Sequence, residues 1–247
     1  MKKLAVVAVA AMTVVLPLSG CSNDDSSPGS IRVLAAASLV DVLKPMVAAY
    51  EHNNPGAKVQ VDTGASSALV QKLTSGAKGD VLVTADEATM TKAVDAGVAK
   101  NPHVVATNRL VIVVPKGNPG KVTDVRYFTV PGNRSVVCAS EVPCGRAAEK
   151  AIAAIGGTPH PISRAVDVRA ALGSVTSGEA DAALVYATDA KSAGDKVETI
   201  PIPDAPVNKY PASALTEQGQ LFVDLLAGPE GQRNERSQYN QCTRQYG

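Results

Sequence analysis

Two short β-branched runs each pass through small residues into a serine that opens a helical segment. Residues 31–40 read IRVLAAASLV, and residues 59–69 read VQVDTGASSAL. A strand followed directly by a helix is the repeating unit of α/β folds, and the first turn of a helix carries unpaired N–H groups at the positive end of its dipole. Such turns bind anions without a charged side chain, so Ser38 and Ser66 are candidate anion-binding residues.

The same alternation continues through the first part of the chain. Strands are predicted at residues 32–35, 58–61 and 81–84, and helices at 39–52, 67–75 and 87–96. This order predicts a parallel sheet with right-handed crossovers, in which ligands lie beyond the carboxyl ends of the strands. Ser38, Ser66 and Asp86 all fall at that edge of the sheet.

The alternation starts again after about residue 109. Strands are predicted at residues 110–114, 135–138, 163–166 and 182–186, and helices at 145–155, 168–177 and 188–191. A strand at 197–202 and a helix at 218–227 are too small for a third domain, so we expect them to cross back and complete the first lobe. The predicted fold class is α/β, a bilobal periplasmic solute-binding protein fold of type II, with a ligand cleft and a hinge. Its first lobe comprises residues 31–108 and 201–247, and its second lobe residues 109–200.

The N-terminal residues have the pattern of a targeting signal. Lys2 and Lys3 precede an apolar run at residues 4–17, which is too short for a membrane span. Residues 1–20 are therefore predicted to be a signal peptide that is removed from the mature protein.

The end of this segment matches the cleavage box of bacterial lipoproteins, because residues 18–21 read LSGC. The match predicts lipidation of Cys21, while the alternative is plain secretion with an unmodified cysteine. Residues 21–30 are polar and rich in Ser, Pro and Gly, as expected of a flexible tether. The protein is thus expected on the outer face of the cytoplasmic membrane, held by the lipid anchor alone and without a spanning segment.

Composition restricts the core and the class of partner. Hydrophobic residues make up 45% of the chain but aromatic residues only 3%, with no Trp, so the core must consist of Val, Leu, Ile and Ala. The formal net charge is +1 and no long charged block occurs, so no nucleic-acid partner is expected. The three histidines show no metal-ligand spacing, and a zinc site is not expected.

Three cysteines besides Cys21 could form a disulfide in an oxidising compartment. Cys138 and Cys144 are close enough in sequence to close a small loop, but Cys242 could pair with either of them instead. Connectivity does not follow from sequence, so these alternatives stay open.

Six short motifs resemble, in order and spacing, those of the molybdate-binding proteins of bacterial ABC importers across residues 31–232. They are AAASL at 35–39, GASSAL at 64–69, GDVLVTAD at 79–86, EVPCG at 141–145, DVRAAL at 167–172 and ALVYATDA at 183–190. The resemblance implies binding of molybdate or tungstate outside the cytoplasm and delivery to an ABC permease and its ATPase. It implies no catalysis and no cofactor. A monomer is expected.

The resemblance also implies a set of oxyanion-binding residues from both lobes. Ser38 and Ser66 would each offer a hydroxyl and a backbone N–H, Cys144 and Val168 backbone N–H groups, and Tyr186 its phenolic hydroxyl. The chemistry agrees, since a tetrahedral dianion only accepts hydrogen bonds and its site should present donors without an inward carboxylate. The family commonly has alanine at the position of Cys144, and a main-chain donor survives that exchange.

Several of these positions also have a purely structural interpretation. A serine at a helix start is usually an N-cap, and Ser67 is predicted to be one. Arg169 either contacts the anion or pairs with Asp80 or Asp86 across the lobes, and we favour the pairing. Asp80 and Asp86 are interpreted as structural or interlobe residues, because a carboxylate facing a dianion would be repulsive.

Three other functions compete with molybdate transport. An enzyme is disfavoured because the chain has no G-x-S-x-G elbow, phosphate loop or recognisable triad. A transcription-factor effector lobe is disfavoured by the leader and by the lack of an N-terminal DNA-binding helix pair. Binding of another tetrahedral oxyanion such as sulfate remains the alternative. Phosphate is disfavoured because its proton at neutral pH needs an acceptor in the site.

Overall fold

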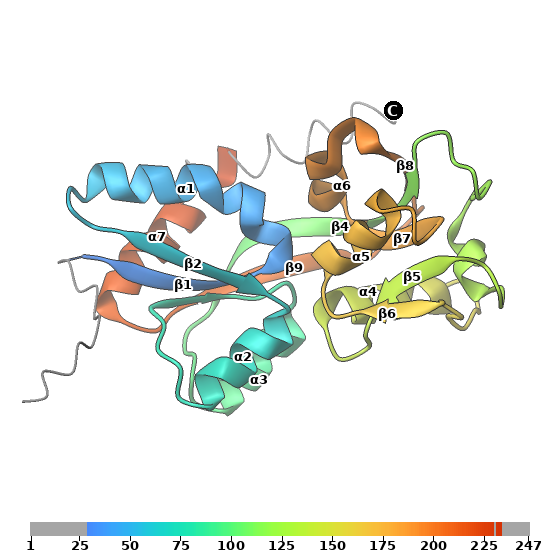
Figure 1. Cartoon of the computed structure of the whole chain (residues 1–247). Coiled ribbons are helices and arrows are strands. Elements are labelled where there is room, and N and C mark those ends of the chain that lie inside the picture. The colour runs from blue at the N-terminus through green and yellow to red at the C-terminus, as the bar shows by residue number, and fades with distance from the viewer. Residues whose placement is uncertain (1–28, 230, 234–247) are drawn as a thin grey trace, which may run out of the picture.

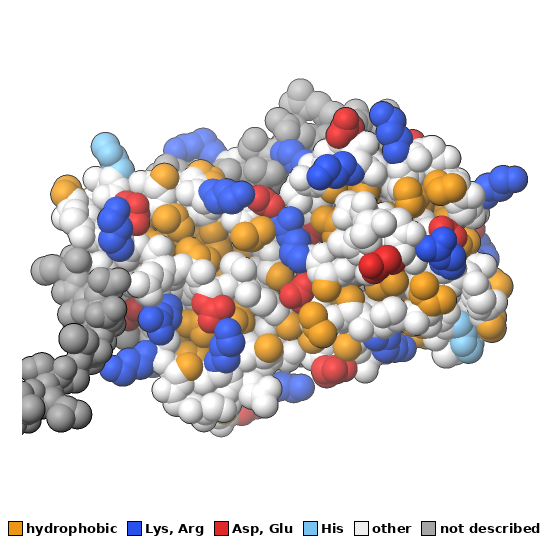
Figure 2. Space-filling model, viewed as in Figure 1, with side chains coloured by type: hydrophobic (Ala, Val, Ile, Leu, Met, Phe, Trp, Pro, Cys, Tyr) orange, Lys and Arg blue, Asp and Glu red, His pale blue; other side chains and the backbone are white. Residues whose placement is uncertain are grey.

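Two α/β lobes lie side by side in the computed structural model, which describes residues 29–229 and 231–233 (Figure 1). Predictions for the signal peptide, for most of the tether, and for Cys21 and Cys242 lie outside the described residues. Within the described ranges, no helix is both long and apolar enough to cross a bilayer. On the face shown in Figure 2, positive and negative side chains are interspersed.

The first lobe is built on a sheet of five strands, one of which, β4 (His103–Pro115), also runs into the second lobe. Strand β1 (Ile31–Ala36) pairs in parallel with β2 (Val59–Gly64) and with β3 (Val81–Val83), and β9 (Val207–Ala214) pairs antiparallel with β3. Helices α1 and α7 pack together on one face, and α2 and α3 on the other (Figure 1). The helical segments are η1 (Ala37–Leu39), α1 (Val40–Asn53), α2 (Ser66–Thr74), α3 (Glu87–Asp95) and α7 (Glu217–Ala227).

The second lobe repeats this design with three parallel strands. Strand β5 (Ser135–Cys138) lies between β6 (Ser163–Ala165) and β7 (Ala182–Tyr186). Its helical segments are η2 (Val125–Thr129), α4 (Pro143–Ala153), α5 (Val168–Thr176), α6 (Ala187–Ala193) and η3 (Gly194–Lys196).

One long strand joins the two lobes. The first half of β4 (His103–Pro115) pairs with β9, and its second half pairs with β7 and with β8 (Val197–Pro201), in each case antiparallel. The chain crosses between the lobes along β4 and again between β8 and β9. This bilobal architecture confirms the predicted fold class.

One prediction about the C-terminal part is wrong, and one of its strands was not predicted. The strand expected at 197–202 does not complete the first lobe, because β8 pairs with β4 in the second lobe. The strand that does complete the first lobe is β9, which the sequence analysis missed. Pro211 makes β9 hard to recognise in the sequence. Proline has no N–H to donate to a neighbouring strand, so its presence argues against a central strand. The structure accommodates Pro211 opposite Val104, where the register of β4 shifts.

The core is aliphatic, as the composition predicts, with a few aromatic side chains at central points. The largest fully buried side chains include Tyr50, Phe222, Tyr186 and Tyr210. Tyr50 of α1 and Phe222 of α7 meet edge to face with ring centroids 5.6 Å apart, which ties the two helices together on the first lobe.

Two glycines in helices provide a matched test of packing. A Cβ added at Gly173, within α5, has no neighbouring atom within 4 Å in the described structure, whereas at Gly219, in α7, it would lie 1.9 Å from the Asp80 carbonyl oxygen. We therefore expect Gly173→Ala to raise the free energy of unfolding by about 0.5–1 kcal/mol. Gly219→Ala should lower it by about 1–3 kcal/mol through overpacking. Urea denaturation measures both, and changes of the same sign would contradict this packing.

Candidate anion-binding site

All five predicted site residues line one small cavity between the lobes. The cavity has a volume of about 20 Å³, and its walls include Ser38 and Ser66 from the first lobe and Cys144, Val168 and Tyr186 from the second. It lies beyond the carboxyl ends of β1 and β2 and at the first turns of the helices that follow them. A space of this size has room for a single water-sized group and is far too small for a sugar or a peptide.

The helices that begin at this cavity mostly lack a side-chain cap. Segments η1, α2, α4 and α6 have no side-chain hydrogen bond at the N-cap. In contrast, α3 and α7, whose first turns do not line the cavity, are capped by Asp86 and Thr216. An uncapped first turn leaves backbone N–H groups for another acceptor. The cavity is therefore surrounded by helix ends that can bind an anion.

The prediction that Ser67 caps its helix is wrong. The N-cap of α2 is Ala65, and Ser66 is the first residue of the helix. The Ser66 side chain is buried, and its Oγ accepts a hydrogen bond from the Ala85 N–H at 3.0 Å. Since the hydroxyl already accepts this bond, its own hydrogen remains for a group in the cavity.

Residues of β9 form hydrogen bonds with the other two hydroxyls, those of Ser38 and Tyr186. The Tyr186 hydroxyl accepts a hydrogen bond from the Asn208 amide at 3.0 Å, and Ser38 Oγ lies 3.0 Å from the hydroxyl of Tyr210. Burial, and then the nearby Tyr210 and Asp86, raise the pKa of Tyr186 well above its usual range. Tyr186 therefore stays protonated and can donate. Asn208 and Tyr210 were not predicted as supporting residues, because Pro211 hides their strand in the sequence.

A disulfide fixes the wall contributed by α4. The structure joins Cys138, at the end of β5, to Cys144 in the first turn of α4. Pro143 before it has no N–H, so the first backbone donor of this helix belongs to Cys144. A Cβ at Gly145 would lie 1.8 Å from the Ala139 carbonyl oxygen, so only glycine fits where the loop packs against the helix.

The charged residues around the cavity do not point their charges into it. Asp167 is the one charged residue among those that line the cavity, and its Oδ1 accepts from the Ala170 N–H, capping α5. The prediction that Arg169 pairs with Asp80 or Asp86 is wrong. Its partner in the first lobe is Asp41, at 2.5 Å. Asp80 lies at the opposite end of β3.

The partner of Asp86 is Arg146, which the sequence analysis did not identify. Arg146 Nε donates to Asp86 Oδ2 at 2.8 Å. Arg146 and Arg169 both lie in the first turn of a helix, where the dipole disfavours a cation. That placement was a signal in the sequence that each arginine has a partner elsewhere. Asp80 and Asp86 were both predicted to be structural or interlobe residues. Asp86 contacts the second lobe through Arg146, and Asp80 accepts hydrogen bonds within the first lobe.

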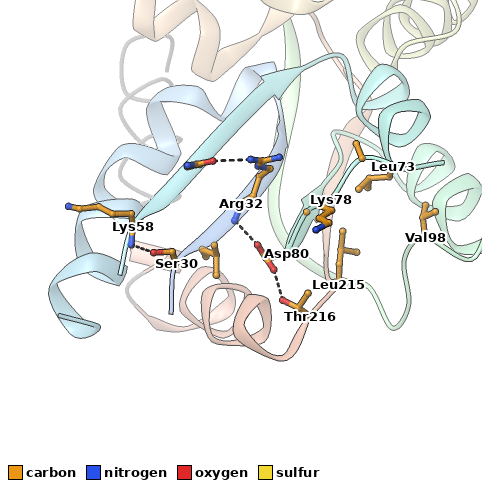
Figure 3. Close-up of a pocket in the computed structure, with 13 residues that line it drawn as sticks. Ser30, Arg32, Lys58, Leu73, Lys78, Asp80, Val98, Leu215 and Thr216 are labelled. Carbon is orange, nitrogen blue, oxygen red and sulfur yellow. Dashed lines mark hydrogen bonds between the residues drawn. The ribbon is translucent and has the colours of Figure 1, made fainter. Parts of the chain in front are cut away.

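A larger pocket of about 560 Å³ lies at the amino ends of the first-lobe strands (Figure 3). It carries Arg32 and Lys78, but it also contains Asp80, which accepts hydrogen bonds from the Arg32 N–H and from Thr216 Oγ1. No helix end of the second lobe contributes to it. The small cavity is therefore the better anion site. Among the described residues, no group of three or more His, Cys, Asp or Glu could hold a metal ion.

Comparison with known proteins gives consistent matches over most of the chain. Residues 31–237 match the family model of bacterial extracellular solute-binding proteins. The molybdate-binding protein ModA of Mycobacterium tuberculosis is 37% identical over 225 residues, with 88% of this chain and 86% of that protein covered. The protein of the same name from Escherichia coli is 30% identical, with 87% and 90% covered.

Solved structures share the fold at lower sequence identity. The periplasmic molybdate-binding protein of Azotobacter vinelandii superposes with a TM-score of 0.72 at 18% identity, covering 85% of this chain and 97% of that one. The sulfate-binding protein SubI of Mycobacterium tuberculosis superposes with a TM-score of 0.74 at 16% identity, covering 85% of each chain.

A buried carboxyl beside the site provides a pH test. Burial raises the pKa of Asp189 to about 7, against the opposing effect of Arg169. Because this value exceeds the unfolded value, the folded state holds the proton more tightly, and the stability gained is lost as pH rises toward 7. Between pH 5 and 7 we expect the unfolding free energy of the parent to fall by up to about 1 kcal/mol per pH unit relative to Asp189→Asn. Urea denaturation measures both slopes.

The control is Asp195→Asn at an exposed position near the same helix, which should keep the slope of the parent. Parallel slopes for the parent and Asp189→Asn would contradict the assignment.

Proposed function

Because the chain belongs to the family of bacterial extracellular solute-binding proteins, we propose that it captures molybdate or tungstate and delivers the ion to an ABC import permease. The observation that carries the proposal is the small cavity in which hydroxyls and helix ends of both lobes converge. The relatives named as molybdate-binding proteins support the choice of ion.

The donor set favours a fully ionised tetrahedral oxyanion. Ser66 and Tyr186 each already accept a hydrogen bond from the protein, so they present hydrogens to the cavity. Asp167 uses its carboxylate as a helix cap. A protonated oxyanion such as hydrogen phosphate would need an acceptor, and would leave its own donor unpaired in this site.

Hydrogen bonds from uncharged groups supply enough free energy to bind the ion without a cationic side chain in the cavity. A hydrogen bond to a charged group contributes about 1.5–3 kcal/mol, so five of them at about 2 kcal/mol each exceed the roughly 8 kcal/mol that micromolar affinity requires. Binding to one lobe followed by closure of the other would desolvate the ion and complete the donor set. In this proposal the ion is bound and released unchanged, and no catalytic step is involved.

The setting of the protein follows from the same proposal. A lipid on Cys21 would hold a monomer on the outer face of the cytoplasmic membrane, with residues 22–30 as the tether. The closed complex would dock on a permease whose ATPase drives import.

Calorimetric titration tests the identity of the ion. The chain from Ser22 onward, which contains every described residue, is titrated with molybdate, tungstate, sulfate and phosphate in one buffer. We expect tight binding of molybdate and tungstate, with sulfate and phosphate at least about 100-fold weaker, a difference of about 3 kcal/mol. Equal binding of sulfate would assign the protein to sulfate instead, and no binding of any ion would contradict the proposal.

Removing the two serine hydroxyls tests the site itself. In Ser38→Ala with Ser66→Ala, two charge-assisted hydrogen bonds are lost, so molybdate affinity should fall by at least about 100-fold. The melting temperature of the unliganded variant should fall by only a few degrees, because Ala85 and Tyr210 each lose a partner. Ser67→Ala, one position from Ser66, is the matched control and should bind like the parent. Unchanged affinity in the double variant would contradict the site.

A further inference from the structure

Two arginines of the second lobe contact the first lobe beside the cavity. Arg146, in the first turn of α4, donates from Nε to Asp86 Oδ2 at 2.8 Å and from a terminal nitrogen to Thr89 Oγ1 at 2.6 Å. Its other terminal nitrogen donates to the Glu141 carbonyl oxygen of its own lobe at 2.6 Å. The guanidinium is thus fixed in one lobe and bound to the other.

Arg169 makes a second bridge from the first turn of α5. One terminal nitrogen lies 2.5 Å from Asp41 Oδ2 in the first turn of α1, and the other donates to Ser192 Oγ at 2.8 Å. Its Nε lies 2.9 Å from Oδ1 of the fully buried Asp189. Two nitrogens of the Arg169 guanidinium therefore contact the second lobe, and the third contacts the first lobe.

Both bridges start next to the groups that face the cavity. Arg146 follows Cys144 by two residues and Arg169 follows Val168 directly, and Cys144 and Val168 line the cavity. Their side chains are only 23% and 27% exposed, so these ion pairs are screened less than ordinary surface pairs. Neither arginine lines the cavity itself.

We propose that Arg146 and Arg169 are positioning residues that hold the lobes closed around the bound anion and thereby set how slowly it leaves. This inference rests on the proposed function. The bridges join groups of opposite lobes, so they stabilise the closed form over any form in which the lobes separate. A larger closed fraction raises the apparent affinity in proportion, and a tighter closed complex slows dissociation.

The carboxylates of the first lobe provide the cleanest test. Asp41→Asn with Asp86→Asn weakens both bridges but leaves the contacts that each arginine makes within its own lobe. Asparagine also serves as an N-cap, so the cap that Asp86 provides to α3 is retained. We expect the double variant to release molybdate at least about 10-fold faster than the parent, with an association rate within about threefold.

The direction of the change in affinity distinguishes the loss of ion pairs from a simple loss of negative charge near the anion. If Asp41 and Asp86 acted only as negative charges near a dianion, their removal would reduce repulsion and tighten binding. The bridges predict weaker binding instead. Asp62→Asn is the matched control, because Asp62 pairs with Lys72 within the first lobe at 2.8 Å. This control should keep the dissociation rate of the parent.

Stopped-flow displacement of molybdate by excess tungstate measures dissociation in the parent, the double variant and the control. Unchanged or slower release in the double variant, or equally fast release in Asp62→Asn, would overturn the proposal.

A second measurement applies if the parent binds no molybdate, an outcome that would contradict the proposed function alone. Small-angle scattering of the unliganded proteins then compares the parent with the double variant. A larger radius of gyration in the double variant supports the bridges, and equal radii overturn them.

Discussion

A buried ion that only accepts hydrogen bonds must be surrounded by donors, and the fold around the cavity follows from that constraint. Segments η1, α2, α4 and α6 all begin there without a side-chain cap. The absence of a cap costs about 1 kcal/mol for each helix. Helices α3 and α7, which begin elsewhere, have theirs. The pattern is not exclusive, since Asp167 caps α5 at the cavity and η3 is uncapped away from it. In the proposed function, an anion would supply the acceptors that the four uncapped first turns lack.

The strands that join the lobes also orient the hydroxyls. Asn208 of β9 donates to the Tyr186 hydroxyl of the second lobe at 3.0 Å and to the Ala85 carbonyl oxygen of the first lobe at 3.1 Å. One amide therefore contacts both lobes from behind the cavity. Tyr210, two residues along the same strand, contacts Ser38 and stacks edge to face on Tyr186. One strand therefore orients a donor hydroxyl from each lobe, Ser38 from the first and Tyr186 from the second.

Periodicity along the chain was enough to predict most elements, because β-branched runs, small-residue turns and glycine stops are local signals. It placed β5 and β7 at their observed bounds. It failed where pairing across the fold decides the outcome: β9 contains a proline, and the lobe that β8 joins depends on β4, more than 80 residues earlier. The site residues came from motifs, whereas the support from Asn208 and the bridge of Arg146 required three-dimensional contacts that no local pattern records.

The division between neutral donors at the cavity and arginines beside it has a physical reason. An arginine in direct contact with the ion would have to be desolvated with it, and that charge would remain buried after release. Beside the cavity, Arg146 and Asp86 are 23% and 16% exposed, so water can reach both groups when the lobes separate. Hydroxyls and amides left without the ion cost far less than a buried charge. In the proposed function, this arrangement would let the protein hold a dianion firmly and still open to deliver it.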